Sequence, residues 1–239
     1  MSVEPTELVP EPASGRVFER ALRPGAADAD GGGRARLDAI ARWLQDVAYL
    51  DLVDAGFEDR GAWIVRRLRI RAERFPRFGE ELTLRTFCSG LGRFSAERRT
   101  SVVGTEARVE AVALWVCLDR EAGRPLRFPR DFVAAYEESA AGRPAGTRLR
   151  HPDPPDGAER VATWLFRATD VDAAGHVNNS HFWEPLEQEL AAGEVPETLD
   201  AEVEHRDPAQ PGEVAIVRAG HMSWMATAGG ALHASMLRA

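Results

Sequence analysis

The stretch from Asp170 to Trp183, which reads DVDAAGHVNNSHFW, decides how this chain can be interpreted. Its first ten residues hold two carboxylates, a glycine, a histidine and two amides, at a point where a polar segment gives way to an apolar one. The same D-x-D-x-x-G spacing occurs in DADGGG at 28–33, where each matching position lies 142 residues earlier. The sequence therefore predicts a duplicated element, whose later copy continues into HVNN and whose earlier copy continues into RARL.

Length and composition are those of an ordinary globular protein. The chain has 239 residues, 44% of them hydrophobic and 28% charged, which is long enough for two small domains. No apolar run approaches the roughly 20 residues that a membrane span needs, and the N-terminus lacks the basic-then-apolar order of a signal peptide. Cys88 and Cys117 lie in apolar, strand-like segments and are interpreted as buried free thiols. We therefore expect a cytoplasmic protein without membrane association.

Charge narrows the choice of partners. The net charge of −8 argues against nucleic acid or another polyanion as a ligand. All 30 basic residues are arginine, and six of them are crowded into residues 66–77. These arginines can form the solvated face of a strand, or a docking patch for an acidic or phosphate-bearing carrier. The members of the candidate patch are Arg66, Arg67, Arg69 and Arg71.

The order of the predicted elements repeats in the two halves. Residues 1–15 are expected to form a flexible tail, followed by a strand at 17–23 and a helix from Leu37 to about Gly56, where apolar residues follow helical spacing. Residues 137–157 show no periodicity and are interpreted as a linker. Strands are predicted at 63–72, 82–85, 93–103 and 107–118, and after the linker at 161–167, 201–205, 212–219, 221–227 and 231–237, with a second helix at 182–192.

A sheet wrapped around one helix is the hotdog arrangement, so the repeated order predicts an α+β double hotdog. We expect two antiparallel sheets, each wrapped around a central helix, with an N-terminal hotdog at 16–136 and a C-terminal hotdog at 158–239. A lone unit would expose a sheet edge, which pairing two units would cover.

The polar motif bridges a strand and a helix, so its side chains are expected near free backbone N–H groups at a helix start. Asp172 can attack an acyl carbon or activate water there, and His176 can orient a substrate, a water or that carboxylate. Asn178 and Asn179 are either helix caps or positioning groups. Asp170 is expected to bond its own backbone in a turn.

The motif resembles the D-x-D-x-N-x-H-V-N-N motif of the acyl-acyl carrier protein (acyl-ACP) thioesterases. Segments 36–46, 79–80, 115–119 and 124–129 look like the N-terminal half of the same family, so the resemblance spans about residues 16–239. It implies a double hotdog that releases free fatty acids from acyl carrier protein, with the acyl-chain pocket in the first hotdog and the catalytic groups in the second. It also implies that Asp172 and His176 are catalytic and that Gly175, Val177, Asn178 and Asn179 position the substrate or its oxyanion.

The chain departs from that family pattern at two places. The family's asparagine between Asp172 and His176 falls on Ala174, and its second acidic or cysteine position falls near Pro208 and Ala209. Residues 172–179 are also similar to bacterial acyl-CoA thioesterases of the 4-hydroxybenzoyl-CoA type, which do without that asparagine.

Three functions remain open from the sequence. The expected one is a thioesterase in fatty acid metabolism that acts on acyl-ACP or acyl-CoA. The alternatives are a non-catalytic protein that binds an acyl group or its carrier, and a hotdog hydratase or dehydratase, whose usual His-x-x-x-Gly spacing is missing after His176 because Ser180 stands at that place. No cofactor is expected, and no metal site, because His176 and His181 lack a supporting cysteine or HxxxH pair. Acyl chain length, carrier preference and the presence of a homodimer stay open.

Overall fold

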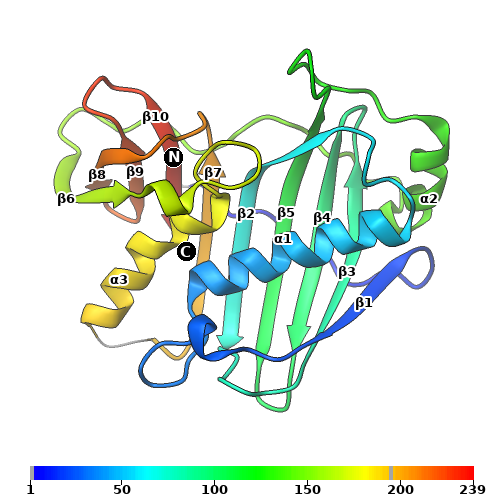
Figure 1. Cartoon of the computed structure of the whole chain (residues 1–239), viewed down its shortest axis with the longest axis horizontal. Coiled ribbons are helices and arrows are strands. Elements are labelled where there is room, and N and C mark those ends of the chain that lie inside the picture. The colour runs from blue at the N-terminus through cyan, green and yellow to red at the C-terminus, as the bar shows by residue number, and fades with distance from the viewer. Residues whose placement is uncertain (1–2, 194–195) are drawn as a thin grey trace.

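A long helix, α1 (Leu37–Asp54), lies across a continuous antiparallel sheet of ten strands (Figure 1). The computed structural model describes residues 3–193 and 196–239. One face of α1 is apolar and buried, including Ile40, Leu44 and Val47, and the helix ends before Gly56, whose φ of +74° suits glycine. The predicted helix is therefore confirmed at both of its ends.

Each half of the chain contributes five strands to the sheet. The first half gives, in spatial order, β1 (Val17–Leu22), β3 (Leu82–Leu91), β4 (Ser95–Val103), β5 (Arg108–Leu118) and β2 (Ala62–Arg74). The second half gives β7 (Leu199–His205), β10 (Leu232–Arg238), β9 (Met222–Ala226), β8 (Gly212–Ala219) and β6 (Glu159–Phe166). The α+β double hotdog is thus confirmed.

The two halves are joined edge to edge, so that the expected pair of sheets is one sheet. Strands β2 and β7 pair from Arg67↔Glu204 to Ala72↔Leu199. Without that pairing both strands would present unpaired N–H and C=O groups, which explains why the halves share a sheet. One hydrophobic core, to which α1 and both halves of the sheet contribute, runs across the junction.

The second half contains a shorter helix than the first. The 3-10 turn at Asn179–Trp183 begins 142 residues after α1 and leads directly into α3 (Glu184–Ala192). Pro185 lies in the first turn of α3, where its missing N–H costs no helical hydrogen bond. The duplication seen in the sequence therefore extends to the position at which each helical segment starts.

Two segments differ from expectation. Residues 130–140 form α2 (Arg130–Ala140), so the predicted linker at 137–157 begins inside a helix. Phe132 and Tyr136 bury the apolar face of α2 against Trp63 and Phe57. The sequence does not predict this helix clearly, because its few apolar positions are separated by alanine and glutamate.

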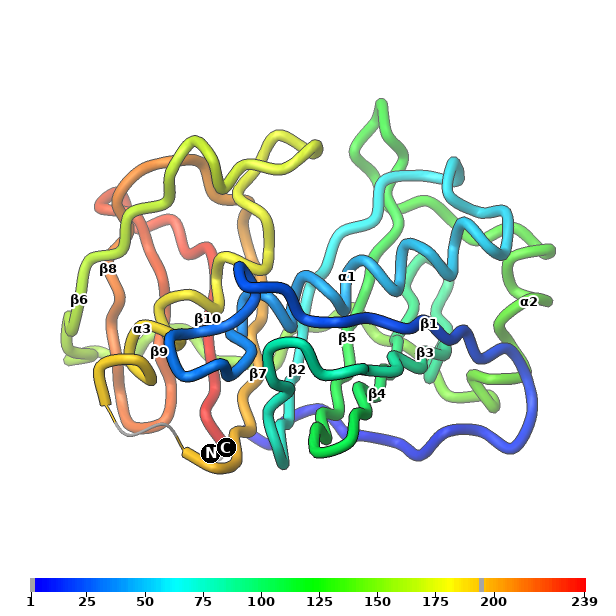
Figure 2. The backbone as a smooth tube through the Cα atoms, turned by 60° about the horizontal axis from the view of Figure 1, so that its bottom comes forward, coloured from blue at the N-terminus to red at the C-terminus, as the bar shows by residue number. Residues whose placement is uncertain are grey.

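The expected flexible tail also differs from the structure. Residues 3–15 cross the sheet on the side away from α1 (Figure 2), with Thr6 and Val9 buried. The N–H of Thr6 donates to Glu202 at 2.7 Å, and Nε of Arg99 donates to the carbonyl of Val9 at 2.9 Å. Charged groups on the outer face of the sheet therefore hold a segment that has no apolar periodicity of its own. None of the helices in the described part of the chain is long and apolar enough to cross a membrane.

Candidate functional site

The polar motif forms a tight turn that is fixed at its base. Val171 and Val177 form an isolated antiparallel bridge, and the N–H of Asp172 donates to the carbonyl of His176 at 3.0 Å. Gly175 has a φ of +79°, a conformation that favours glycine and lets the chain reverse. The N–H of Ala174 donates to Oδ1 of Asp172 at 2.8 Å, so the turn itself holds one oxygen of this carboxylate.

The second oxygen of Asp172 is oriented by Asn178, whose Nδ2 donates to Oδ2 of Asp172 at 2.9 Å. The Oδ1 of Asn178 accepts the N–H of Ser180 at 2.9 Å, which determines the orientation of the amide. Asn178 therefore caps the helical segment, as one of its expected roles requires, and also orients the carboxylate of Asp172.

Gln45, on α1 of the first hotdog, supports Asn178 from the opposite side. Its Nε2 donates to Oδ1 of Asn178 at 3.2 Å, and its Oε1 accepts from Nδ2 of Asn178 at the same distance. The site thus draws on both halves of the chain through Gln45, Asn178 and Asp172. Sequence reasoning missed Gln45, although Gln45 lies 142 residues before Glu187 and so matches a polar position of the second helix.

The backbone donors differ from the expected set. The N–H groups of Gly175, Val177 and Asn178 donate to the carbonyls of Asp172, Ala209 and Asp170. Within the part of the chain that the structure describes, the N–H groups of His176 and Asn179 make no hydrogen bond. Asn179 is the first residue of the helical segment 179–192, so its N–H is one of the unpaired donors that every helix start presents.

Asp170 makes no contact with the side chains of Asp172, Asn178 or Gln45 among the hydrogen bonds of the described residues. It is 6% exposed, and its Oδ2 accepts the N–H of Arg167 at 2.7 Å. The expected role of Asp170 as a turn residue that bonds its own backbone is therefore confirmed.

A cavity of about 270 Å³ opens beside the motif. Asp172, His176 and Asn179 line it from the motif, while Trp63 and Arg66 line it from β2. His176 is exposed, and its ring makes no hydrogen bond to the carboxylate of Asp172 in the described chain, so the two predicted catalytic side chains share a cavity without bonding each other.

His205 on β7 also lines this cavity and was given no role from the sequence. The residue is 6% exposed, its ring packs edge-on against Phe182 at 5.1 Å, and neither ring nitrogen has a hydrogen-bond partner among the described residues. Burial lowers the pKa of His205 to about 3, so the ring is neutral at physiological pH. Asp207 lines the same cavity and brings a carboxylate close to the position where the family pattern is interrupted at Pro208.

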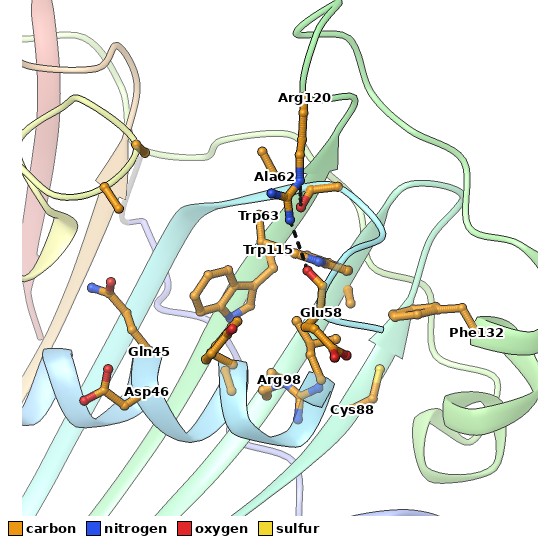
Figure 3. Close-up of a pocket in the computed structure, with 17 residues that line it drawn as sticks. Gln45, Asp46, Glu58, Ala62, Trp63, Cys88, Arg98, Trp115, Arg120 and Phe132 are labelled. Atoms are coloured by element: carbon orange, nitrogen blue, oxygen red, sulfur yellow. Dashed lines mark hydrogen bonds between the residues drawn. The ribbon is translucent and has the colours of Figure 1, made fainter. Parts of the chain in front are cut away.

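A second, larger cavity of about 460 Å³ lies between α1 and the first half of the sheet (Figure 3). It shares Trp63 and Ala174 with the first cavity, so the motif turn stands where the two meet. Leu52, Trp115 and Phe132 give it an apolar wall. Cys88 lies in the same wall, but burial raises the pKa of its thiol to about 11, which makes it unsuitable as a nucleophile.

The four arginines of the predicted docking patch do not form one free surface. Arg67 is 6% exposed and lies close to Glu97, Glu202 and Glu204, while Arg69 forms a fork with Asp200 at 2.8 and 2.6 Å. Arg71 is exposed and pairs with Glu73 at 2.8 Å, and Arg66 donates to the carbonyl of Arg206 at 2.8 Å.

Arg66 and Arg67 are successive residues of β2, so their side chains point to opposite faces of the sheet. Arg66 points to the cavity beside the motif, whereas Arg67 lies on the outer face, under the segment that contains Thr6. Two neighbouring arginines of the candidate patch therefore lie on opposite faces of the sheet.

The earlier copy of the motif is closed by an ion pair. Arg34, which stands where the later copy has His176, is 6% exposed and bonds to both Asp30 and Glu187. Glu187 also accepts the N–H of Leu37 at 2.9 Å, at the start of α1. The N–H of Leu37 at this helix start is therefore bonded inside the protein, whereas the N–H of Asn179 at the equivalent position of the later copy has no partner among the described residues.

Comparison with known proteins finds acyl-ACP thioesterases that are similar to this chain in sequence or in structure. Residues 15–136 match the family model of the acyl-ACP thioesterase N-terminal domain. The crystal structure of an acyl-ACP thioesterase from Bacteroides thetaiotaomicron is similar with a TM-score of 0.75 and 16% identity, covering 93% of this chain and 96% of that one. The 12:0-ACP thioesterase from Umbellularia californica gives a TM-score of 0.68 at 16% identity, with the same coverage. An uncharacterized protein of Mycobacterium tuberculosis is 29% identical over 88% of this chain and 85% of its own length.

Proposed function

The chain belongs to the acyl-ACP thioesterase family, and on that premise we propose that it hydrolyses fatty acyl thioesters of acyl carrier protein or coenzyme A. The products are the free fatty acid and the carrier thiol, which places the reaction in fatty acid metabolism. Cys88 and Cys117 are free and buried, which supports the reducing, cytoplasmic compartment expected for it.

The observation that carries the proposal is the fixed carboxylate of Asp172. One of its oxygens is held by the turn and the other by Asn178, which is itself held by Gln45. Such support keeps a reacting group in one orientation while leaving it accessible, since Asp172 is exposed and lines a cavity. In this geometry Asp172 attacks the thioester carbon or deprotonates a water that does so.

The developing negative charge falls on the thioester oxygen. The unpaired N–H groups of Asn179 and His176 are the donors available to it, and the helical segment that starts at Asn179 adds its positive dipole end. A thiolate leaves without strong protonation, so His176 acts by positioning substrate or water rather than as an obligatory acid.

The two cavities suggest how the substrate lies. The apolar cavity between α1 and the sheet takes the acyl chain, and the cavity beside His176 takes the thiol arm of the carrier. The carbon under attack then lies beside Ala174, where both cavities meet. Arg66 and Arg206 at the cavity beside His176 favour the negative charge of a phosphopantetheine arm.

A non-catalytic acyl- or carrier-binding role is the second candidate, and Ala174 favours it because the family's amide is lost there. Asn178, Gln45 and the neighbouring Asp207 and His205 supply polar groups to the same site, which is why we rank hydrolysis first.

The test is thiol release by the purified full-length protein from acyl-ACP and acyl-CoA thioesters of several chain lengths. We expect Asp172→Asn to lower kcat by about 10² to 10⁴-fold, the usual contribution of a general base. Asp30→Asn is the matched control, because Asp30 occupies the position equivalent to Asp172 in the earlier copy of the motif. Hydrolysis that survives in Asp172→Asn would refute the assignment of this residue, and acyl-ACP binding without turnover by the wild type would favour the second candidate.

A further inference from the structure

Arg98 is an unusual residue for the wall of an acyl cavity. It stands on β4 and lines the cavity between α1 and the sheet together with Cys88 and Trp115 (Figure 3). The residue is 7% exposed, so its charge is held almost entirely inside the protein. A cavity built only for a hydrocarbon chain has no use for a buried guanidinium, because taking such a group out of water is costly.

The hydrogen bonds of Arg98 are incomplete. Its Nη1 lies 2.6 Å from Oδ2 of Asp51 without an aligned hydrogen bond, and no described residue accepts from its Nε or Nη2. The adjacent Arg99, on the other face of β4, bonds through Nε, Nη1 and Nη2 to Val9, Ala111 and Glu110. The contrast identifies Arg98 as a donor with spare capacity on the side of the cavity.

The charges around Arg98 also leave room for an acceptor. Asp51, 1% exposed, pairs with Arg98 and with Arg16, whose Nε lies 2.7 Å from its Oδ1, and it accepts the hydroxyl of Tyr136 at 3.0 Å. One buried carboxylate therefore serves two guanidinium groups, and the second carboxylate of the cluster, Asp54, is exposed. Burial opposes the charge of Arg98, but Asp51 keeps its pKa above the ordinary value, so the residue stays cationic.

Arg98 and Asp51 lie where the distal end of an acyl chain would reach. Gln45, which supports the catalytic motif, precedes Asp51 by six residues on the same helix, a separation of about 9 Å along α1. Figure 3 shows the cavity extending from Gln45 to Arg98 and Phe132. An acyl group whose reacting carbon lies beside the motif would therefore bring its far end to Arg98.

We infer that the acyl substrate carries a hydrogen-bond-accepting oxygen, as a hydroxyl, carbonyl or carboxylate, at its distal end, where Arg98 receives it. This inference rests on the proposed thioester hydrolysis and names the substrate class of that site. A plain methyl end would cover the guanidinium without replacing the hydrogen bonds lost to water, whereas an oxygen would satisfy Nε or Nη2.

The experiment compares three coenzyme A thioesters of equal length: decanoyl, ω-hydroxydecanoyl and the ω-carboxy counterpart. The octanoyl and dodecanoyl series extend it, because the distal oxygen must reach Arg98. We expect kcat/KM of the wild type to favour at least one oxygenated member over the plain chain by about tenfold to a hundredfold. Arg98→Met should remove that preference and improve the plain chain, while Arg98→Lys, which keeps a cationic donor, should retain part of it.

The outcomes separate this inference from the proposed function. Hydrolysis that favours the plain chain at every length overturns the role of Arg98 and leaves the thioesterase intact. An unchanged ratio in folded Arg98→Met does the same. No hydrolysis of these coenzyme A thioesters or of the acyl-ACP thioesters of the first assay refutes the proposed function itself. Should Arg98→Met fail to fold, the substrate ratio of the wild type still decides, because it requires no variant.

Discussion

Replacing Gln45 tests the candidate site directly, because Gln45 lies in the first hotdog and bonds Asn178 of the motif in the second. Replacing it with methionine keeps the size and the helix propensity of the side chain and removes both hydrogen bonds to Asn178, each 3.2 Å long. A neutral hydrogen bond contributes about 0.5–1.5 kcal/mol net, and these two are long, so their loss is worth about 1–2 kcal/mol in total. If that energy orients Asn178 and through it Asp172, kcat falls by about 5- to 30-fold.

The assay is thiol release at saturating thioester, so that kcat is separated from KM, together with thermal unfolding of the same preparations. Asp46→Asn is the matched control. Asp46 follows Gln45 on α1 and, like Gln45, lines the cavity between α1 and the sheet, but it makes no bond to Asn178 in the described structure. We expect Asp46→Asn to leave kcat within about twofold of the wild type, since no contact with the motif is lost.

A double-mutant cycle then tests the mechanism. Because Gln45 acts through Asn178, the effects of Gln45→Met and Asn178→Ala should be less than additive in kcat. The reasoning fails if the two effects add fully, or if Gln45→Met lowers the melting temperature without changing kcat.

The remaining predictions concern stability. Glu187→Gln breaks the buried ion pair with Arg34, and we expect it to lower the free energy of unfolding by about 3 kcal/mol. This value lies at the lower end for a buried pair, because Asp30 still contacts Arg34. Urea unfolding with an unchanged midpoint would contradict this expectation. His205 has a folded pKa of about 3 against an ordinary value of 6.5, so the unfolded chain binds an extra proton between these values and stability falls as pH drops below about 6.5. The slope is about 1.4 kcal/mol per pH unit for one such group, and His205→Phe should remove it between pH 6 and 5; an equal slope in both proteins would show that His205 does not cause it.

Much of the fold could be predicted because its causes are local and repeated. Alternation marked the strands, helical spacing marked α1, and the recurrence at 142 residues revealed the two units. The union of the halves through β2 and β7 also follows from a simple physical demand, since both strands would otherwise be unpaired at an edge.

The parts that escaped prediction depend on contacts between distant segments. Residues 3–15 carry no periodicity and are held by charged groups such as Glu202 and Arg99 on the far face of the sheet. Arg67 is buried beside carboxylates of β4 and β7, and a sequence pattern carries no sign of such contacts between distant strands. Gln45 could be placed beside Asn178 only once α1 was known to cross the start of the second helical segment.

The register of the duplication accounts for the different surroundings of the two copies of the motif. Gln45 and Glu187 occupy equivalent positions, and each reaches the turn of the other half: Gln45 bonds Asn178, and Glu187 bonds Arg34 and the N–H of Leu37. An amide in the first position orients a side chain and leaves the exposed carboxylate free to react. A carboxylate in the second position forms a buried ion pair with Arg34 and accepts the N–H of Leu37. The same geometry thus leaves Asp172 exposed, as the proposed hydrolysis requires, and holds Arg34 in a buried ion pair, with the difference set by one amide and one carboxylate.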